Sequence, residues 1–352
     1  MRPRPVEGIE GKQDATVNGR DRIFALLNGQ PVDRVPLMPI TMMFAADQIG
    51  AKYLQYVTDY RVLVEAQLRT AERFDLDFVS CISDPARECA DLGAPVRFFD
   101  DQPPAFVESE ALLADKSVLS RLRIPDPLGG GRMHDRVKGA ALLKEKAGSD
   151  KMVEGWVEGP CCMAANLRGI NTLMLDFYDD PVFVDELLAF VTEVAIAFGR
   201  AQRDAGVDLM GVGDAPSSLI GRPLFENVIA PWHAKLVAAL RAMGLKTRSH
   251  ICGNTSKICE ARAKIGYDIL DIDSQVAPEL ARLKMGPETV ILGNVPTVAV
   301  MERGTPDDVR RVAAECHRAL GDRFILSAGC EIPRSTPIAN MDALCDYVHA
   351  RG

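Results

Sequence analysis

The sequence lacks the features that mark membrane proteins and nucleic-acid-binding proteins. Its longest apolar candidate, Leu187–Phe198, is interrupted by Thr192 and Glu193, and it falls short of the roughly 18 apolar residues of a transmembrane helix. The N-terminus has no apolar run of the signal-peptide type. Basic side chains are outnumbered, 41 against 49 acidic ones, for a net charge of -8. We therefore expect a cytoplasmic protein whose partners are neither nucleic acid nor membrane.

The nine cysteines do not form the pattern of a disulfide scaffold. Their number is odd, their spacing is irregular and no secretion signal precedes them. In a reducing compartment such thiols are usually buried in the core or bind a metal. We expect five of them to be purely structural: Cys161, Cys162, Cys259, Cys316 and Cys345.

The 352 residues, 47% hydrophobic and 26% charged, have the composition of a globular protein. Residues 1–18 are polar and rich in Pro and Gly, which predicts a flexible N-terminal arm. Residues 19–352 are predicted to form a single domain, in which short β-rich runs alternate with helical patterns. The runs are Arg34–Ile40, Leu76–Cys81, Met152–Val157, Val207–Val212, Leu245–Ile251, Ile269–Ile272, Thr289–Leu292 and Phe324–Ser327.

The helical patterns between these runs have clear start signals. Asn18 is a plausible cap for a helix over residues 20–27, and Thr305 can cap Pro306–Leu320, where proline suits the first turn. Apolar residues recur at helical spacing in Pro181–Arg203, and Pro223–Met243 is a further helix. Strand and helix in alternation indicate a parallel sheet.

The predicted fold is α/β, a (β/α)8 TIM barrel with an N-terminal extension and an insertion, Pro85–Gly148, after the second predicted strand. The alternative is an open doubly wound sheet. However, no GxGxxG follows the first predicted strand and the sequence contains no P-loop.

The most reactive side chains stand in two short segments that follow predicted strands. His250 and Cys252 are two residues apart at the end of Leu245–Ile251, and residues i and i+2 of a strand point to the same face. Cys330 follows the last predicted strand and should lie at the same carboxyl-terminal mouth, where barrel enzymes keep their sites. One imidazole and two thiolates are a good donor set for Zn²⁺. The alternative is that all three are ordinary core or loop residues.

Several short segments of the chain occur in a recognisable order. They are Asp33-Arg34-Val35-Pro36, Ser83-Asp84, Leu92-Gly93-Ala94, Glu158-Gly159-Pro160, Gly213-Asp214, His250-Ile251-Cys252-Gly253, Asp271-Ile272-Asp273, Gly293-Asn294-Val295 and Gly329-Cys330-Glu331-Ile332-Pro333. In this order and spacing they resemble the uroporphyrinogen decarboxylase superfamily over nearly the whole chain.

Within that superfamily the chain is similar to the zinc-dependent methyltransferase branch. Residues 40–46 carry no arginine where the decarboxylase has an Arg-Gln-Ala-Gly-Arg stretch, and Cys330 stands where it has a histidine. Asp84, however, falls where the decarboxylase keeps an essential aspartate. Enzymes of the methyltransferase branch move methyl groups to or from the cobalt of a corrinoid on a separate protein.

The resemblance implies that His250, Cys252 and Cys330 bind Zn²⁺ and carry catalysis. A fourth protein ligand stays open, with Glu154, Glu158 and Glu331 as candidates. The corrinoid (methylcobalamin) must come from a transient partner protein, because the chain has no Asp-x-His-x-x-Gly signature. Other polar side chains are expected to bind substrate at the mouth, although capping and loop hydrogen bonding are the alternative roles. These are Asp84, Asn166, Asp214, Asp273, Gln275 and Asn294.

Three functions remain open at this point. The first is a zinc-dependent corrinoid methyltransferase acting on a small molecule, either a methoxylated aromatic or other methyl donor, or a thiol or folate acceptor. The second is a lyase that decarboxylates an acid smaller than uroporphyrinogen. The third is a non-catalytic barrel that binds a corrinoid protein. The sequence fixes neither the direction of transfer nor the oligomeric state.

Overall fold

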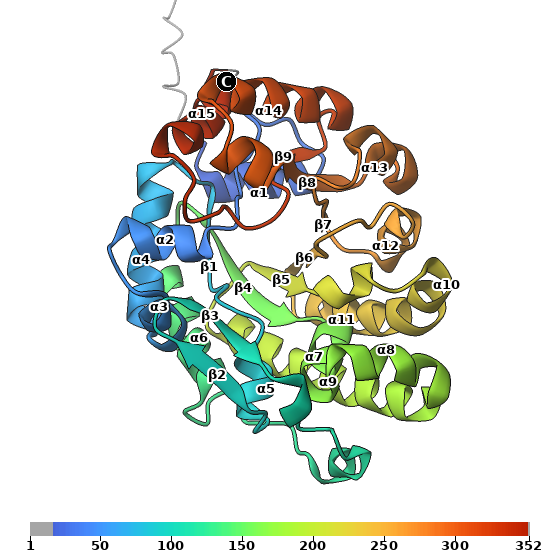
Figure 1. Cartoon of the computed structure of the whole chain (residues 1–352). Helices are drawn as coiled ribbons and strands as arrows, with labels where there is room; N and C mark the ends of the chain where they lie inside the picture. The colour runs from blue at the N-terminus through green and yellow to red at the C-terminus, as the bar shows by residue number, and fades with distance from the viewer. Residues whose placement is uncertain (1–16, 351–352) are drawn as a thin grey trace, which may run out of the picture.

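The computed structural model describes residues 17–350, and these form a barrel of parallel strands surrounded by helices (Figure 1). Within them, the main sheet has seven strands in chain order, and each neighbouring pair is parallel. The strands are β1 (Phe78–Ser80), β4 (Met152–Glu158), β5 (Leu209–Gly213), β6 (Lys246–His250), β7 (Ile269–Asp271), β8 (Val290–Val295) and β9 (Phe324–Ala328). This confirms the predicted barrel class.

The first predicted strand, Arg34–Ile40, closes the barrel without being a regular strand. It forms one bridge, between Leu37 and Leu326 of β9. On its other side the N–H of Asp77 donates to the carbonyl of Leu37 at 3.1 Å. The two prolines of the segment have no N–H to give to a ladder. The segment therefore spans the gap between β9 and β1 with fewer hydrogen bonds than the predicted strand would make.

The predicted helix starts are confirmed where caps were assigned. In α1 (Gly19–Leu27) the side chain of Asn18 accepts from the N–H of Asp21 at 2.8 Å. In α14 (Pro306–Leu320) the hydroxyl of Thr305 accepts from the N–H of Asp308 at 3.3 Å. The segment Pro223–Met243 is continuous but irregular, because a π-helical turn at 225–229 separates α10 (Arg222–Leu224) from α11 (Ala230–Ala242).

The remaining helices cover the outside of the sheet and the connections at its ends (Figure 1). They are α2 (Met42–Gln48), α3 (Tyr53–Thr58), α4 (Tyr60–Arg73), α5 (Arg87–Asp91), α6 (Arg132–Ala147), α7 (Pro160–Arg168), α8 (Ile170–Asp179), α9 (Pro181–Asp204), α12 (Cys259–Ile265), α13 (Pro278–Met285) and α15 (Ile338–His349).

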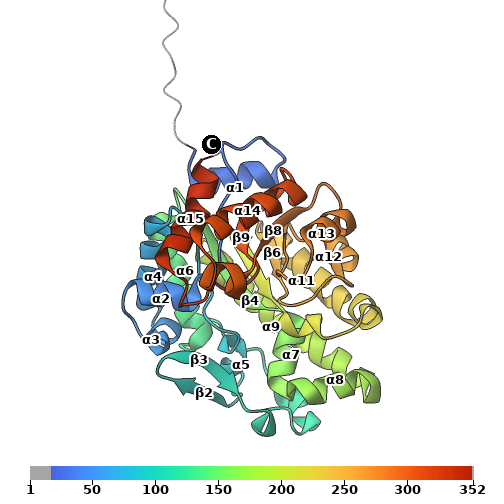
Figure 2. The same cartoon turned by 45° about the horizontal axis from the view of Figure 1, so that its top comes forward.

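The insertion after β1 is shorter than the predicted Pro85–Gly148. It contains α5 and an antiparallel hairpin of β2 (Val96–Phe99) and β3 (Gln102–Phe106). Figure 2 shows this hairpin at the end of the molecule away from α1. The last part of the predicted insertion is α6, which packs on β4, α4 and α9 and is therefore a helix of the barrel wall. The long polar loop before α6 concealed this role in the sequence.

The predicted arm, residues 1–18, lies outside the described residues except for Val17 and Asn18, which belong to the start of the fold. Among residues 17–350, no helix is both long and apolar enough to cross a membrane.

Candidate metal centre

The three predicted ligands come together at the carboxyl-terminal mouth of the barrel. The Nε2 atom of His250 lies 2.9 Å from the Sγ of Cys252 and 3.7 Å from the Sγ of Cys330, and the two sulfurs are 3.3 Å apart. His250 is buried and both cysteines are half-buried. Among the described residues this is the one group of three or more His, Cys, Asp and Glu side chains close enough to hold a metal ion.

The local backbone explains how β6 brings two ligands to one point. His250 ends the strand, and Gly253 turns the chain with a φ of +85°, a conformation that favours glycine. Cys330 follows β9, three strands further round, so it reaches Cys252 only because the sheet curls into a barrel. The triad therefore depends on closure of the fold as well as on the His-x-Cys spacing.

The donor set fits a zinc ion. The Cys252 thiol lowers the pKa of Cys330 by hydrogen bonding to it, and His250 lowers it further, whereas the same contact raises the pKa of Cys252. One sulfur is thus favoured as the thiolate that zinc prefers, and an imidazole completes a common N/S set. None of the three carboxylates considered as a fourth ligand belongs to this group: Glu154, Glu158 and Glu331.

A buried ion-pair network holds the imidazole of His250. Its Nδ1 lies 2.8 Å from Oδ2 of Asp271, at the end of β7. Asp271 also accepts from Nε and Nη2 of Arg248, and the Nη1 of Arg248 donates to Glu154 at 3.0 Å. Arg248 and Glu154 have no exposed surface. A carboxylate on the far nitrogen fixes the imidazole with Nε2 free to bind a metal.

The inward face of β5 carries no side chain at Gly211 and Gly213, and the indole of Trp156 occupies the space beside them. Strand pairing aligns Trp156 with Gly211 and Gly211 with Arg248. A Cβ atom at Gly211 would stand only 2.2 Å from the indole ring. The ring centre of Trp156 lies 6.1 Å from that of His250 and 5.8 Å from Cζ of Arg248. Glycine on β5 therefore allows β4 to contact the side chains of β6.

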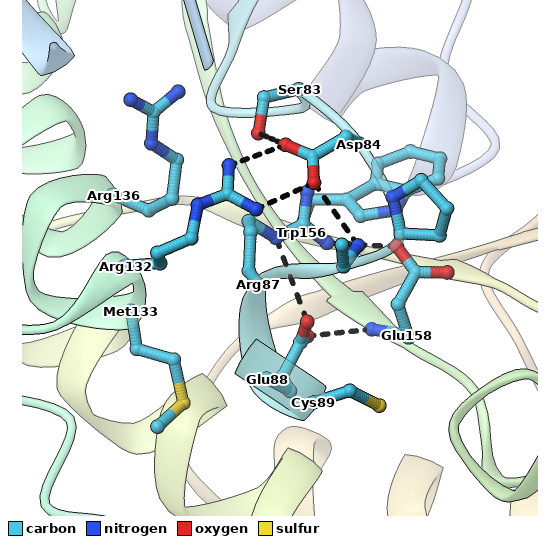
Figure 3. A network of polar contacts seen from close by, with 12 residues as sticks. Ser83, Asp84, Arg87, Glu88, Cys89, Arg132, Met133, Arg136, Trp156 and Glu158 are labelled. Carbon is cyan, nitrogen blue, oxygen red and sulfur yellow. Dashed lines mark hydrogen bonds and ion pairs between the residues drawn. The ribbon is translucent and has the colours of Figure 1, made fainter. Parts of the chain in front are cut away.

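Asp84 lies in a second network beside the mouth, shown in Figure 3. Arg132 of α6 donates to both of its oxygens at 2.7 Å, and the hydroxyl of Ser83 donates to Oδ2 at 2.8 Å. Burial alone would raise the pKa of Asp84, but the ion pair with Arg132 lowers it to about 2. Asp84 is thus a fully engaged carboxylate with no exposed side-chain surface.

Two glutamates and one arginine form the other half of this network (Figure 3). The Nη2 of Arg87 donates to Oε1 of Glu158 at 2.8 Å, and its Nε lies 3.6 Å from Oε2 of Glu88. The indole N–H of Trp156 also donates to Glu158, at 3.2 Å. The Nε and Nη1 of Arg87 and the Oε2 of Glu88 have no hydrogen-bond partner in the structure. Burial raises the pKa of both glutamates.

The remaining predicted substrate residues make local contacts around the mouth. Asp273 accepts from the N–H groups of Gly253 and Gln275, at 2.9 and 3.0 Å, and Gln275 itself is exposed. Asn294 donates to the carbonyls of Asp273 and Val276, so it ties β8 to the loop after β7. Asp273 thus lies next to the Cys252 segment, whereas the side chain of Asn294 also accepts from the thiol of Cys316 on α14 and so faces the outer layer of the barrel.

Asp214 and Asn166 are engaged on the other side of the mouth. Asp214 accepts from the N–H of Cys162 at the start of α7, and it lies 2.6 Å from Nε2 of the buried His233. Asn166 donates to the carbonyl of Pro85 at 3.0 Å. Substrate binding by these six residues stays a prediction: Asp84, Asn166, Asp214, Asp273, Gln275 and Asn294.

Sequence reasoning gave no role to Asp271, Arg248, Arg87 or Arg132. The position of Arg248 could have indicated its role. It stands two residues before His250 and so shares its inward face, and a buried guanidinium there needs a carboxylate partner. The position of Arg132 gave no such indication. It follows a polar loop 48 positions after Asp84 in the chain and meets it only in the fold.

The fold and the site together define a parallel α/β barrel with a His-x-Cys and a distant Cys at its carboxyl-terminal mouth. A model of the uroporphyrinogen decarboxylase (URO-D) family matches residues 18–351. The chain therefore belongs to that family.

Proteins similar to this chain include methyltransferases and decarboxylases. Methylcobamide:CoM methyltransferase MtbA of Methanosarcina mazei is 27% identical over 335 residues, which cover 93% of this chain and 96% of that protein. A uroporphyrinogen decarboxylase of Nocardia farcinica is 25% identical over 313 residues, covering 85% and 86%. The solved structure of a methyltransferase from Methanosarcina mazei has a TM-score of 0.87, 22% identity and coverage of 95% and 99%. This last likeness shows the fold.

Proposed function

We propose that this protein is a methyltransferase of a corrinoid system, with zinc bound by His250, Cys252 and Cys330. It moves a methyl group between a small substrate and the cobalt of a corrinoid on a separate protein. The observation that carries the proposal is the approach of the three donor atoms, all within 4.8 Å of one another at the barrel mouth. The similarity to methylcobamide:CoM methyltransferases over nearly the whole chain supports the corrinoid link.

The chain's own residues prepare this site for a metal. Asp271 orients the imidazole of His250, and Arg248 holds Asp271 in place. The half-buried sulfurs of Cys252 and Cys330 keep one side of the group accessible. Bound zinc would supply Lewis acidity, which activates a thiol acceptor or the oxygen of a methyl ether. Positioning supplies much of the rate in an in-line transfer of this kind.

A small apolar cluster next to the metal centre supports an apolar substrate. Ile40, Ile82 and Trp156 pack together apart from the main core, with Met42 against them. Trp156 connects this cluster to His250. The three side chains of the cluster are 3 to 6% exposed, so a methyl donor with an aromatic or aliphatic body would meet an apolar wall here and not a charged one. We therefore place methoxylated aromatics first among the substrates to test.

The decarboxylase alternative is less well supported by the geometry. Asp84 would be its key residue, but Arg132 engages both of its oxygens. The arginines nearest to it, Arg87 and Arg132, are already paired with carboxylates. A substrate with many carboxylates needs cations free to pair with it.

Metal analysis and a methyl-transfer assay test the proposal. Purified protein should contain about one zinc per chain, and Cys330→Ala should lose most of it. Cys259→Ser is the matched control, because Cys259 is buried on α12 and lies outside the metal group. The assay uses cobalamin with aryl methyl ethers, and methylcobalamin with thiols. Full zinc content in Cys330→Ala would show that the ligand assignment is wrong, and decarboxylation without methyl transfer would favour the lyase.

A further inference from the structure

Two buried glutamates share a single arginine beside the metal centre. Arg132 is matched by Asp84, but Arg87 faces both Glu88 and Glu158 (Figure 3). The side chains of Arg87 and Glu88 have no exposed surface, and that of Glu158 is 6% exposed. Two ionised carboxylates with one guanidinium would leave an uncompensated negative charge in a buried space. One proton kept by the pair would remove this surplus charge.

The strand register directs Glu158 towards the metal ligands. Glu158 ends β4 and pairs with Gly213 of β5, which in turn pairs with His250 of β6. The two residues thus lie at one level of the barrel, two strand spacings or roughly 9 to 10 Å apart at their Cα atoms. Residues 154, 156 and 158 lie on one face of β4 because side chains alternate along a strand. This face points into the barrel, since Glu154 and Trp156 both contact Arg248.

No side chain stands between Glu158 and His250 on β5. The position between them is Gly213, and a Cβ there would come within 3.1 Å of Oε2 of Glu158. Oε1 of Glu158 accepts from Arg87 and Trp156. One oxygen is thus fixed, while the other lies over the backbone at Gly213, the β5 residue that pairs with His250. Glu88, by contrast, lies on α5, and its Oε1 accepts from the N–H of Glu158.

We propose that Glu158 is the acid–base residue of the methyl transfer, an inference that rests on the proposed function. When a methyl ether is the donor, its C–O bond breaks and the electron pair stays on oxygen. The methyl carbon bonds to cobalt with the electron pair of Co(I), which becomes Co(III). The oxygen takes the proton of Glu158, which regains one from solvent. In the opposite direction the Glu158 carboxylate takes the proton of a thiol as its sulfur receives the methyl group and cobalt returns to Co(I).

The surroundings of Glu158 suit this exchange. The charged and titratable groups that face it are Arg87 and Glu88 of α5, Asp84 of the loop after β1, and Cys162 of α7. Burial is the main cause that raises its pKa, and Glu88 adds to the shift, while Arg87 opposes it. A carboxyl group that keeps its proton near neutral pH is matched to general acid catalysis.

The test compares leaving groups. Full-length, zinc-loaded wild type and Glu158→Gln are assayed with reduced free cobalamin and aryl methyl ethers whose phenols span several pKa units. Without the acid, the rate should depend more steeply on the phenol pKa. We expect a loss of about 10²- to 10⁴-fold for the most basic phenoxide and little loss for the most acidic one. If the wild type uses only thiols, the same comparison is made with methylcobalamin and thiols of different pKa.

Glu154→Gln is the matched control, because it removes another buried carboxylate from the inward face of β4 and leaves the pairing of Arg87 with Glu88 and Glu158 unchanged. This variant should lower the rates with all the ethers by a similar factor, and the dependence of the rate on the phenol pKa should stay that of the wild type. Zinc content is measured for every variant. Glu158→Asp is added in case Glu158→Gln folds poorly. Because it keeps a carboxyl group, its dependence of the rate on the phenol pKa should return part of the way to that of the wild type. An unchanged dependence of the rate on the phenol pKa in Glu158→Gln, or the same steepening in Glu154→Gln, overturns the assignment and leaves the methyltransferase in place. A wild type that transfers no methyl group at all overturns the proposed function together with it.

Discussion

Replacing Asp271 by asparagine tests whether the network behind His250 prepares the metal centre. The Oδ2 of Asp271 lies 2.8 Å from Nδ1 of His250 and 2.8 Å from Nη2 of Arg248. An asparagine carbonyl can still accept from one of them. Its amide group would then point its hydrogens at the remaining donors, and the negative charge that orients both partners would be gone.

The expected cost has two parts. Loss of a carboxylate partner behind a metal-bound histidine typically weakens metal binding 10- to 100-fold, or about 1.4 to 2.7 kcal/mol. Breaking one side of a buried ion pair typically lowers stability by about 3 to 5 kcal/mol, and the carbonyl retained in asparagine should keep the loss below that range. Zinc affinity is measured by competition with a chromophoric chelator, and stability by urea denaturation of the metal-free protein.

Glu154→Gln separates these two effects. Glu154 accepts from the opposite end of the same guanidinium, at 3.0 Å, and it is connected to His250 through Arg248 and Asp271. Both substitutions should lower stability, but only Asp271→Asn should weaken zinc binding by a factor of ten or more. Wild-type zinc affinity in Asp271→Asn, or an equal loss in Glu154→Gln, would refute the reasoning that the carboxylate acts on the metal through His250.

Three further predictions follow from other contacts. Gly211→Ala should destabilise the fold by about 1 to 3 kcal/mol and shift the tryptophan fluorescence, because its Cβ would stand 2.2 Å from the indole of Trp156; an unchanged melting temperature would contradict this. Burial raises the pKa of Glu88 above its unfolded value, so the stability that its protonated form contributes is lost as pH rises. Glu88→Gln should therefore gain stability relative to wild type as the pH rises above the unfolded pKa of about 4.3, measured by denaturant unfolding, and a constant difference would exclude the shift. Lys257→Glu, in the exposed loop after β6, should raise the KM for the corrinoid partner protein while sparing free methylcobalamin; Arg318→Glu, in the last turn of α14 at the opposite end of the barrel, is the control, and equal effects on both cobalt substrates would argue against docking at the mouth.

Much of the fold could be predicted because its signals are local. The caps at Asn18 and Thr305 and the apolar spacing of α9 depend only on residues within a few positions of each other, and the structure confirms them. The His250 and Cys252 pair was predictable for the same reason, since strand alternation places residues i and i+2 on one face. The insertion was less predictable, because only packing on β4 shows that α6 belongs to the barrel wall.

The sequence by itself determined the barrel class and the three donor side chains of the candidate metal centre. Tertiary structure decided which groups support those donors. Asp271 meets His250 across 21 positions of chain, Arg248 meets Glu154 across 94, and Arg87 meets Glu158 across 71. A buried charge must find its partner wherever the closed sheet brings one, and no local pattern records that choice. The surplus carboxylate beside Arg87, from which the proton on Glu158 is inferred, exists only because the folded barrel brings these residues together in one buried space.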